Sequence, residues 1–281
     1  MSLEEIIIDS ATVPNGELYI EKMGMGKPLI LIHAGFSDRR DWMHQINAFG
    51  EKYQTITYDQ RGSGNSSTVT TAFSPADDLK AVIEHLKLEK VILVGHSIGG
   101  TIALDFALQY PDKVLGLVLV ASGVNGYQWS KNYLDWMQSI WSTLQPEKMT
   151  ELFLSAPFYA LGMQESSIKS EIETITKENF DKVLTWKTFD VRDVHWFFPE
   201  AHTKLKNLKV PTFVVYGDKD SKDIQKIASI LSQNIKNVKT NVIRGSDHLL
   251  NFEMPDKLNK LILEFLSNLN HELASKSKSL T

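Results

Sequence analysis

Two patterns of hydrophobic and polar residues alternate along the first third of the chain. Runs with the character of strands lie at residues 17–21, 28–32, 55–58, 91–94 and 115–120. The run at 91–94 is continuously apolar and β-branched, which is typical of a strand buried on both faces of a sheet. Stretches with helical spacing separate several of these runs. The alternation predicts an α/β fold, in which a mainly parallel central sheet is flanked by helices.

The pattern changes near Gly123 and changes back near Val210. Between these positions the spacing is helical and aromatic residues are frequent, but no run has the character of a buried strand. Strands are predicted again at 210–216 and 238–243, and a final amphipathic helix is predicted over 258–269.

The helical segment leaves and re-enters the predicted sheet at strand ends, which is where ligands bind in open α/β sheets. We therefore expect residues 1–122 and 210–281 to form the α/β core. Residues 123–209 are expected to form an inserted helical cap, which would lie over the site as a lid.

Composition narrows the class of protein further. The chain has 281 residues, of which 42% are hydrophobic and 23% charged, so it can bury a large core. Its net charge is −4 and its body has no basic block, which argues against nucleic acid as a partner. The chain contains no cysteine, which excludes disulfides, thiolate metal sites and cysteine nucleophiles.

The sequence also indicates where the protein is located and how it assembles. No apolar run reaches the roughly 18 residues that a membrane span needs. The acidic N-terminus lacks the basic start and apolar stretch of a signal peptide. We expect a cytoplasmic protein that acts on a small molecule, does not bind membranes, and exists as a monomer or a homodimer.

The most informative motif is Gly95–Gly99, which reads Gly-His-Ser-Ile-Gly. It follows the strand at 91–94 and precedes a predicted helix that ends before Pro111. A serine at such a junction sits on a sharp turn that exposes its hydroxyl, and glycines on either side avoid crowding it. A phosphate-binding loop is disfavoured because no G-K-[ST] follows. We therefore interpret Ser97 as a nucleophile.

A serine nucleophile needs a base, and the base needs an orienting acid. His248 is the one downstream histidine on a loop at the expected carboxyl edge of the sheet, between the last strand and the final helix. Asp220 follows the strand that ends at residue 216, so we predict that it orients His248. Asp218 and Asp223 are the rivals for that role.

The developing oxyanion needs backbone donors. One is expected to be the N–H of Ile98, directly after the nucleophile, and the other the N–H of Gly35, with Phe36 as its rival. His33 in the same loop is interpreted as structural. The aromatic residues of the cap favour an apolar pocket, in which Phe36, Trp136 and Trp196 are expected to contact the substrate. The chemistry requires no metal and no organic cofactor.

These residues resemble the motifs of lid-bearing serine hydrolases of the α/β-hydrolase superfamily, over about residues 17 to 269. The matching segments are His33–Phe36, Asp59–Ser66, Gly95–Gly100, Gly217–Asp220, and Asp247–His248 followed by Glu253–Pro255. The resemblance implies the chain order Ser, Asp, His, which Ser97, Asp220 and His248 obey.

The resemblance also assigns two further residues. Arg61 is implied to tie loops together rather than to bind substrate. Asp247 stands where many relatives carry glycine, and we expect it to add negative charge beside His248. Haloalkane dehalogenases and epoxide hydrolases carry aspartate at the elbow, so the serine of this chain disfavours both chemistries.

The function we predict is hydrolysis of an ester-type bond in a small, largely apolar substrate, through an acyl-enzyme. Esterases, lactonases, carbon–carbon bond hydrolases and cofactor-free haloperoxidases share this triad on this fold, and the sequence does not separate them. Two alternative functions belong to other classes of protein. One is a hydrolase-fold sensor or signalling protein for a small molecule. The other is a proline iminopeptidase-like peptidase, suggested by the stretch Tyr58–Gly62.

Overall fold

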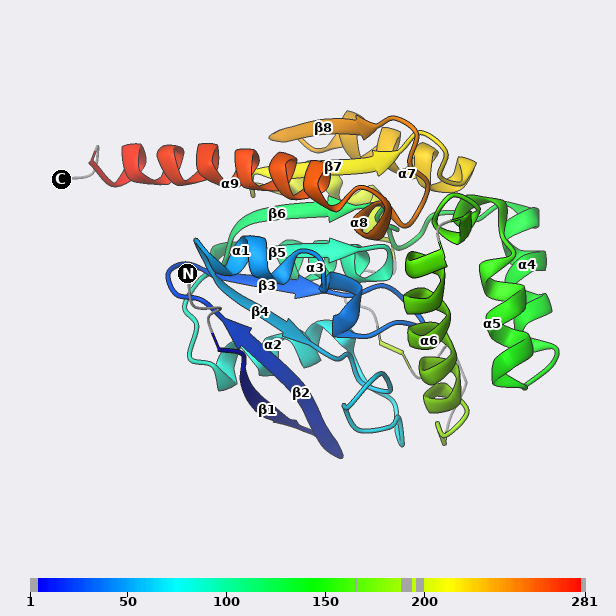
Figure 1. The fold of residues 1–281 in the computed structure, drawn as a ribbon. Helices are drawn as coiled ribbons and strands as arrows, with labels where there is room; N and C mark the ends of the chain where they lie inside the picture. Colours follow the sequence, from blue (N-terminus) through cyan, green and yellow to red (C-terminus); the bar gives the residue numbers. More distant parts are fainter. Residues whose placement is uncertain (1–4, 165, 188–193, 196–199, 279–281) are drawn as a thin grey trace.

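The computed structural model describes residues 5–164, 166–187, 194–195 and 200–278. Eight strands form one sheet in the order β1-β2-β4-β3-β5-β6-β7-β8. The strands are β1 (Ile7–Val13), β2 (Gly16–Met23), β3 (Pro28–Ile32), β4 (Gln54–Tyr58), β5 (Val91–His96), β6 (Val114–Val120), β7 (Thr212–Gly217) and β8 (Val238–Ile243). All pairs from β4 onwards in that order are parallel, whereas β2 runs antiparallel to both β1 and β4. The predicted α/β fold with a mainly parallel sheet is confirmed (Figure 1).

Strand β1 was not predicted. It forms a hairpin with β2 at the edge of the sheet, and Asn15 adopts the left-handed conformation, with φ of 63°, in the turn between them. Asn-Gly at residues 15 and 16 is a strong hairpin signal in a sequence. The strand itself lies half in solvent, with Ile8 64% exposed, so its apolar residues do not follow the pattern of a buried strand.

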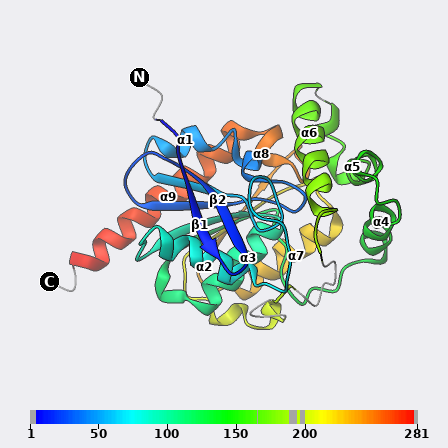
Figure 2. The same cartoon turned by 90° about the horizontal axis from the view of Figure 1, so that it is seen from below.

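Helices cover both faces of the sheet (Figure 2). Helices α1, α8 and α9 lie on one face, and α2, α3 and α7 lie on the other. Their bounds are α1 (Ile46–Gly50), α2 (Pro75–His85), α3 (Ile98–Gln109), α7 (Lys222–Asn234), α8 (Leu250–Glu253) and α9 (Pro255–Lys278). Short 3₁₀ helices are η1 (Arg39–Trp42), η2 (Pro111–Lys113), η6 (Ala201–Thr203) and η7 (Leu205–Asn207). Between these layers, every residue of β5 is buried, as its apolar sequence requires.

A group of helices follows β6 and lies beyond the carboxyl ends of the parallel strands (Figure 1). It contains α4 (Lys131–Trp141), α5 (Pro146–Leu154), η3 (Pro157–Tyr159), η4 (Gly162–Gln164) and α6 (Ser166–Val183). These helices have a hydrophobic cluster of their own, which includes Ile140, Met149 and Phe180. No strand longer than an isolated bridge occurs among the described residues between 123 and 209.

Polar contacts fasten α6 to the loops at the carboxyl edge of the sheet. The Asn179 amide donates to Asp38 at 2.8 Å and accepts from the Gly64 N–H at 2.9 Å. Nearby, the Arg40 guanidinium bridges Asp38 and Glu178, at 2.6 Å to each. The helical segment is therefore held over the strand ends, on the side of the molecule where the predicted site residues fall.

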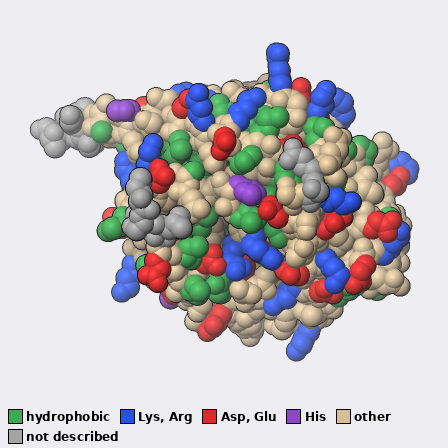
Figure 3. Space-filling view, in the orientation of Figure 1, with side chains coloured by type: hydrophobic (Ala, Val, Ile, Leu, Met, Phe, Trp, Pro, Cys, Tyr) green, Lys and Arg blue, Asp and Glu red, His purple; other side chains and the backbone are tan. Residues whose placement is uncertain are grey.

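The surface carries charges of both signs. On the face shown in Figure 3, Lys and Arg side chains are interspersed with Asp and Glu, in keeping with the small net charge of −4. Across the described ranges, no helix combines the length and the apolar character needed to cross a bilayer.

Candidate active site

Ser97 occupies a sharp turn between β5 and α3. Its backbone has φ of 55° and ψ of −117°, a conformation that costs a residue with a side chain free energy and that persists only where the surroundings enforce it. Here the Ser97 N–H donates to the carbonyl of Val120 on the neighbouring strand at 2.9 Å. A Cβ at Gly95 or at Gly99 would collide with backbone of the turn or of β3. The predicted strand–turn–helix arrangement is therefore confirmed.

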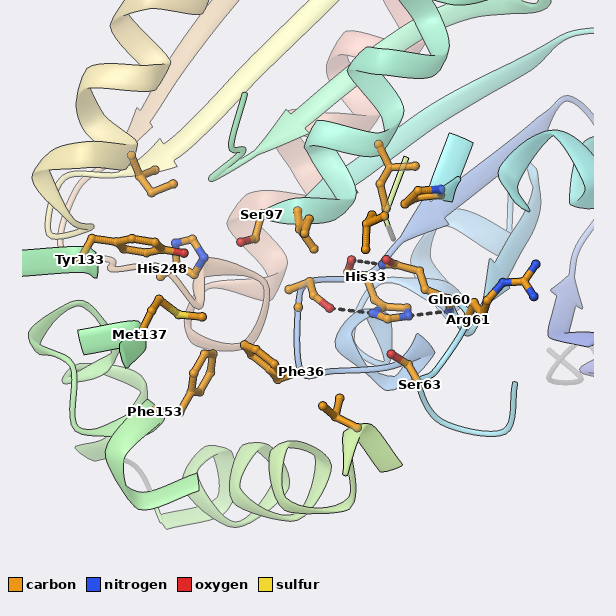
Figure 4. A pocket seen from close by; sticks show the side chains of 18 of the residues that line it. His33, Phe36, Gln60, Arg61, Ser63, Ser97, Tyr133, Met137, Phe153 and His248 are labelled. Atoms are coloured by element: carbon orange, nitrogen blue, oxygen red, sulfur yellow. Dashed lines mark hydrogen bonds between the residues drawn. The ribbon is translucent and has the colours of Figure 1, made fainter. Parts of the chain in front are cut away.

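His248 and Asp220 meet at the ends of β8 and β7. The Asp220 Oδ2 and the His248 Nδ1 are 2.9 Å apart, and both side chains are buried. The two rival acids bond elsewhere: Asp218 accepts from the Gly245 N–H, and Asp223 accepts from hydroxyls next to α4. Nδ1 of His248 is bonded to Asp220, and the second ring nitrogen has no partner among the described residues. Figure 4 shows the Ser97 hydroxyl on the side of the cavity that His248 lines.

A second histidine–aspartate pair lies beneath the first and was not predicted. His96 Nδ1 is 2.9 Å from Asp41 Oδ2, and His96 Nε2 is 3.0 Å from the carbonyl oxygen of His248. The Asp41 carboxylate also accepts from the Ala34 N–H at 3.1 Å and from the Asn251 amide at 3.2 Å. His96 Nε2 carries a proton, because the carbonyl oxygen of His248 can only accept, and His96 Nδ1 faces the Asp41 carboxyl group in the geometry of an ion pair.

The pKa of His96 is raised and that of Asp41 is lowered, as expected when each group stabilises the charge of the other. Burial alone would lower the pKa of His96, but the Asp41 carboxylate raises it above its ordinary value. Burial alone would raise the pKa of Asp41, but the His96 charge lowers it. The pair thus links the loop after β3 to the backbone of His248. Its partners are 55 residues apart, at positions without a motif spacing, so the sequence offered no signal for it.

Two residues of the surrounding loops make the structural contacts that we expected, and both also line the cavity. His33 is structural: its Nε2 accepts from the Gln60 N–H at 2.9 Å, so its Nδ1 carries the proton and donates to the Ala34 carbonyl at 2.7 Å. Arg61 ties loops together through two hydrogen bonds to the buried carboxylate of Asp78, at 2.6 and 2.9 Å.

Asp247 differs from its predicted role. Its carboxyl group accepts from the N–H groups of Leu161 and Leu249 and shares a hydrogen bond with Glu253. Burial, together with the hydrogen bond and the charge of Glu253, raises the pKa of Asp247 to about 8. At neutral pH this carboxyl is therefore largely protonated. It does not supply the negative charge beside His248 that its position in the sequence suggested.

This raised pKa predicts how stability depends on pH. The unfolded chain releases the Asp247 proton near pH 4, whereas the folded chain holds it until about pH 8. Folding stability contributed by this group is therefore present at low pH and falls as the pH rises from about 4 to 8. Asn is a neutral isostere of the protonated acid, so Asp247→Asn is expected to be close to wild type at pH 4 and more stable at pH 8. Urea unfolding across this range measures the effect, and an equal difference at all pH values would contradict it.

Three backbone N–H groups in the loops next to Ser97 could serve as oxyanion donors. Ile98 is the first residue of α3, so its N–H has no acceptor within the helix. In the described part of the chain, the N–H groups of Gly35 and Phe36 also have no acceptor. Phe36 has φ of 54°, an unusual value for a bulky residue, in the turn next to the serine. Ile98 and one of the two β3-loop residues are thus available as a donor pair.

The candidate site opens into a cavity of about 420 Å³ between the sheet and the helical segment. Ser97 and His248 line it, as do the expected substrate contacts Phe36 and Trp136. The third expected contact, Trp196, lies outside the described residues. Phe36 is stacked on Phe180, with ring centres 4.6 Å apart, so it belongs both to the cavity wall and to the hydrophobic cluster of the helices.

A serine on a strand-to-helix turn, at the centre of a mainly parallel sheet, is the architecture of α/β hydrolases. The chain belongs to this family: the model of the alpha/beta hydrolase fold family matches residues 27–255. The resemblance inferred from the sequence is therefore confirmed.

Individual relatives are distant and span most of the chain. A 2-hydroxy-6-oxononadienedioate/2-hydroxy-6-oxononatrienedioate hydrolase of Paraburkholderia phymatum is 26% identical, covering 86% of this chain and 88% of its own. The carboxylesterase YbfK of Bacillus subtilis is 23% identical over 85% of this chain and 79% of its own. A solved N-acyl homoserine lactone degrading enzyme superimposes with a TM-score of 0.77 at 25% identity, over 92% of this chain and all of its own. The family and these relatives support hydrolase activity.

Proposed function

We propose that this protein is a serine hydrolase that cleaves an ester-type bond of a small, largely apolar substrate. Ser97 is the nucleophile, His248 the general base and Asp220 the residue that orients His248. The observation that carries the proposal is the hydrogen bond of 2.9 Å between Asp220 and His248, whose ring lines the same cavity as Ser97. Residues 123–209 act as the cap that encloses the substrate.

The reaction follows from these positions. His248 takes the hydroxyl proton as the Ser97 oxygen attacks the substrate carbonyl, and the N–H groups of Ile98 and of Gly35 or Phe36 stabilise the oxyanion. The tetrahedral intermediate collapses, and the leaving alcohol departs with the proton from His248. Water then attacks the acyl-enzyme, again giving its proton to His248. Release of the acid restores the Ser97 hydroxyl.

The shape and lining of the cavity support a substrate of modest size. Its volume of about 420 Å³ falls in the range of small-molecule pockets. Phe36, Trp136, Met137 and Phe153 contribute apolar surface to its wall. An ester or a lactone with an apolar acyl part therefore fits this site better than a highly charged molecule.

Hydrolysis of a carbon–carbon bond is the second candidate, favoured by the dienedioate hydrolase among the relatives. Both reactions use an activated serine, so a probe that labels the serine does not distinguish them. The choice of substrate does. An enzyme that turns over aryl esters slowly, but a vinylogous diketone rapidly, belongs to the second class. Turnover far below one per second on every substrate, together with ligand-dependent binding of a partner protein, indicates a sensor instead.

Labelling with a fluorophosphonate probe tests the proposed nucleophile. We expect the wild-type protein to be labelled stoichiometrically and Ser97→Ala to remain unlabelled, because the probe reacts with an activated serine hydroxyl. Aryl esters of increasing acyl length then map the cavity, and activity is expected to fall once the chain exceeds the enclosed volume. A wild-type protein that is folded but never labelled would contradict the proposal.

A further inference from the structure

The helical segment places two tyrosines in the cavity, and the reaction as described uses neither. Tyr133 lies on α4 and Tyr159 ends η3, and both line the cavity together with Ser97 and His248. In Figure 4 the side chain of Tyr133 extends from α4 toward His248. The ring of Tyr159 meets the ring of His248 edge-on, with ring centres 5.6 Å apart.

The backbone holds Tyr159 at this place. The His248 N–H donates to the carbonyl of Phe158 at 3.1 Å, and the Leu161 N–H donates to the carboxyl of Asp247 at 2.8 Å. These two hydrogen bonds flank Tyr159 on both sides and join its segment to the loop that carries His248. The side chain of Tyr159 is 5% exposed, so it is fixed in a buried position next to the candidate base.

Ring contacts hold Tyr133. It stacks on Trp129 with ring centres 4.1 Å apart, and its centre is 5.4 Å from that of Trp136. Within the described part of the chain, neither the Tyr133 hydroxyl nor the Tyr159 hydroxyl has a hydrogen-bond partner. Both residues line the cavity, so each hydroxyl is available to bond a ligand there.

Both phenols are donors at neutral pH. Burial raises the pKa of Tyr133 to about 12, with a smaller contribution from the charge of Asp223. Burial raises the pKa of Tyr159 well above its ordinary value, and nearby charged groups add to this shift. The two hydroxyls therefore remain protonated and can donate to an oxygen acceptor. The apolar residues of the same wall, such as Trp136 and Met137, favour an acceptor without negative charge.

We propose that Tyr133 and Tyr159 form a hydrogen-bonding subsite for a neutral oxygen acceptor in the leaving group of the substrate. The inference rests on the proposed serine hydrolase function. Because His248 gives its proton to the leaving oxygen, hydroxyls beside its ring meet the leaving-group side of the scissile bond. The substrate class is an ester or lactone with an apolar acyl part and a second oxygen, such as a carbonyl or an ether, close to the leaving oxygen.

A matched pair of esters tests the subsite. The leaving group of 2-oxopropyl butanoate carries a ketone oxygen where isobutyl butanoate carries a methyl group. We expect the ratio of kcat/KM for the ketone ester to that for the isobutyl ester to fall about 3- to 10-fold in Tyr133→Phe or Tyr159→Phe, and further in the double variant. A purely structural role would lower both rates together and leave the ratio unchanged.

Tyr53→Phe is the matched control. It removes a buried hydroxyl that accepts from Asn270 outside the cavity, and the ratio is expected to stay at its wild-type value. A second measurement needs only the wild type. We expect 1-hydroxypropan-2-one to inhibit ester hydrolysis at about 3- to 10-fold lower concentration than 2-methylpropan-1-ol.

The outcomes separate the two proposals. If the wild type reacts with the fluorophosphonate but both Phe variants keep the wild-type ratio, the subsite is wrong and the proposed function stands. Equal inhibition by the two alcohols also overturns the subsite. If the wild type does not react with the fluorophosphonate, the proposed function is wrong, and the subsite is wrong with it.

Discussion

Replacing Ser97 by alanine is expected to lower kcat/KM for a good ester substrate by about 10⁴- to 10⁶-fold, without unfolding the protein. The loss is large because no other group can form the acyl-enzyme. His248→Ala should cost a similar factor, since an unactivated serine hydroxyl is a poor nucleophile. Asp220→Asn should cost about 10⁴-fold, because the ring of His248 is then held in the wrong tautomer.

Two further measurements separate this mechanism from a loss of structure. The double variant of Ser97 and His248 should be about as slow as either single variant, because the two residues act as a unit. Asp218→Asn is the matched control for Asp220→Asn. Its carboxylate bonds to the Gly245 N–H rather than to His248, so activity should be retained. A Ser97→Ala enzyme that keeps even one-hundredth of the wild-type rate would contradict the assignment.

The largest effect on stability is expected at Asp78. Its carboxylate and the Arg61 guanidinium form two hydrogen bonds, and both side chains are almost fully buried. Among the described residues, Asp78→Ala leaves the buried Arg61 charge with the carbonyl of Pro14 and the ring of Phe73 as contacts, and with no carboxylate. We expect a loss of about 3–5 kcal/mol in the free energy of unfolding. Equilibrium unfolding in urea measures it.

An exposed pair provides the comparison. Lys131 and Asp135 lie 2.5 Å apart on the outer face of α4, where both side chains are more than half exposed. Asp135→Ala should change stability by less than about 0.5 kcal/mol, because such pairs are screened by solvent. Replacing Arg61 and Asp78 together by apolar residues of similar volume should recover much of the loss. A decrease below about 1 kcal/mol in Asp78→Ala would show that the buried pair does not lock these loops.

Local sequence patterns were sufficient to predict the strands that are buried on both faces of the sheet. Residues 91–94 of β5 and residues 117–120 of β6 are continuously apolar, and burial on both faces of a parallel sheet is the physical reason for that pattern. Edge strands have no such requirement. β1 has one face in solvent, so its pattern is weak, and only the Asn-Gly turn at residues 15 and 16 would have revealed it.

The protonation of Asp247 could not be predicted from its neighbours in the sequence. The sequence suggested that Asp247 would be a negative charge beside His248. In the fold it lies against the carboxyl group of Glu253 and away from water, so its pKa rises to about 8. Protonation depends on which groups surround a carboxyl in three dimensions, and the adjacent position in the chain says little about that.

By itself, the sequence determined the fold class, the turn at Ser97 and the choice of Asp220 and His248 as its candidate partners. It could do so because a buried strand, a crowded glycine turn and a loop at a strand end each leave a mark within a few residues. Only the tertiary structure decided that His96 and Asp41 form an ion pair beneath His248, and that the hydroxyls of Tyr133 and Tyr159 reach the same cavity. These contacts join elements that are far apart in the chain, and packing alone brings them together.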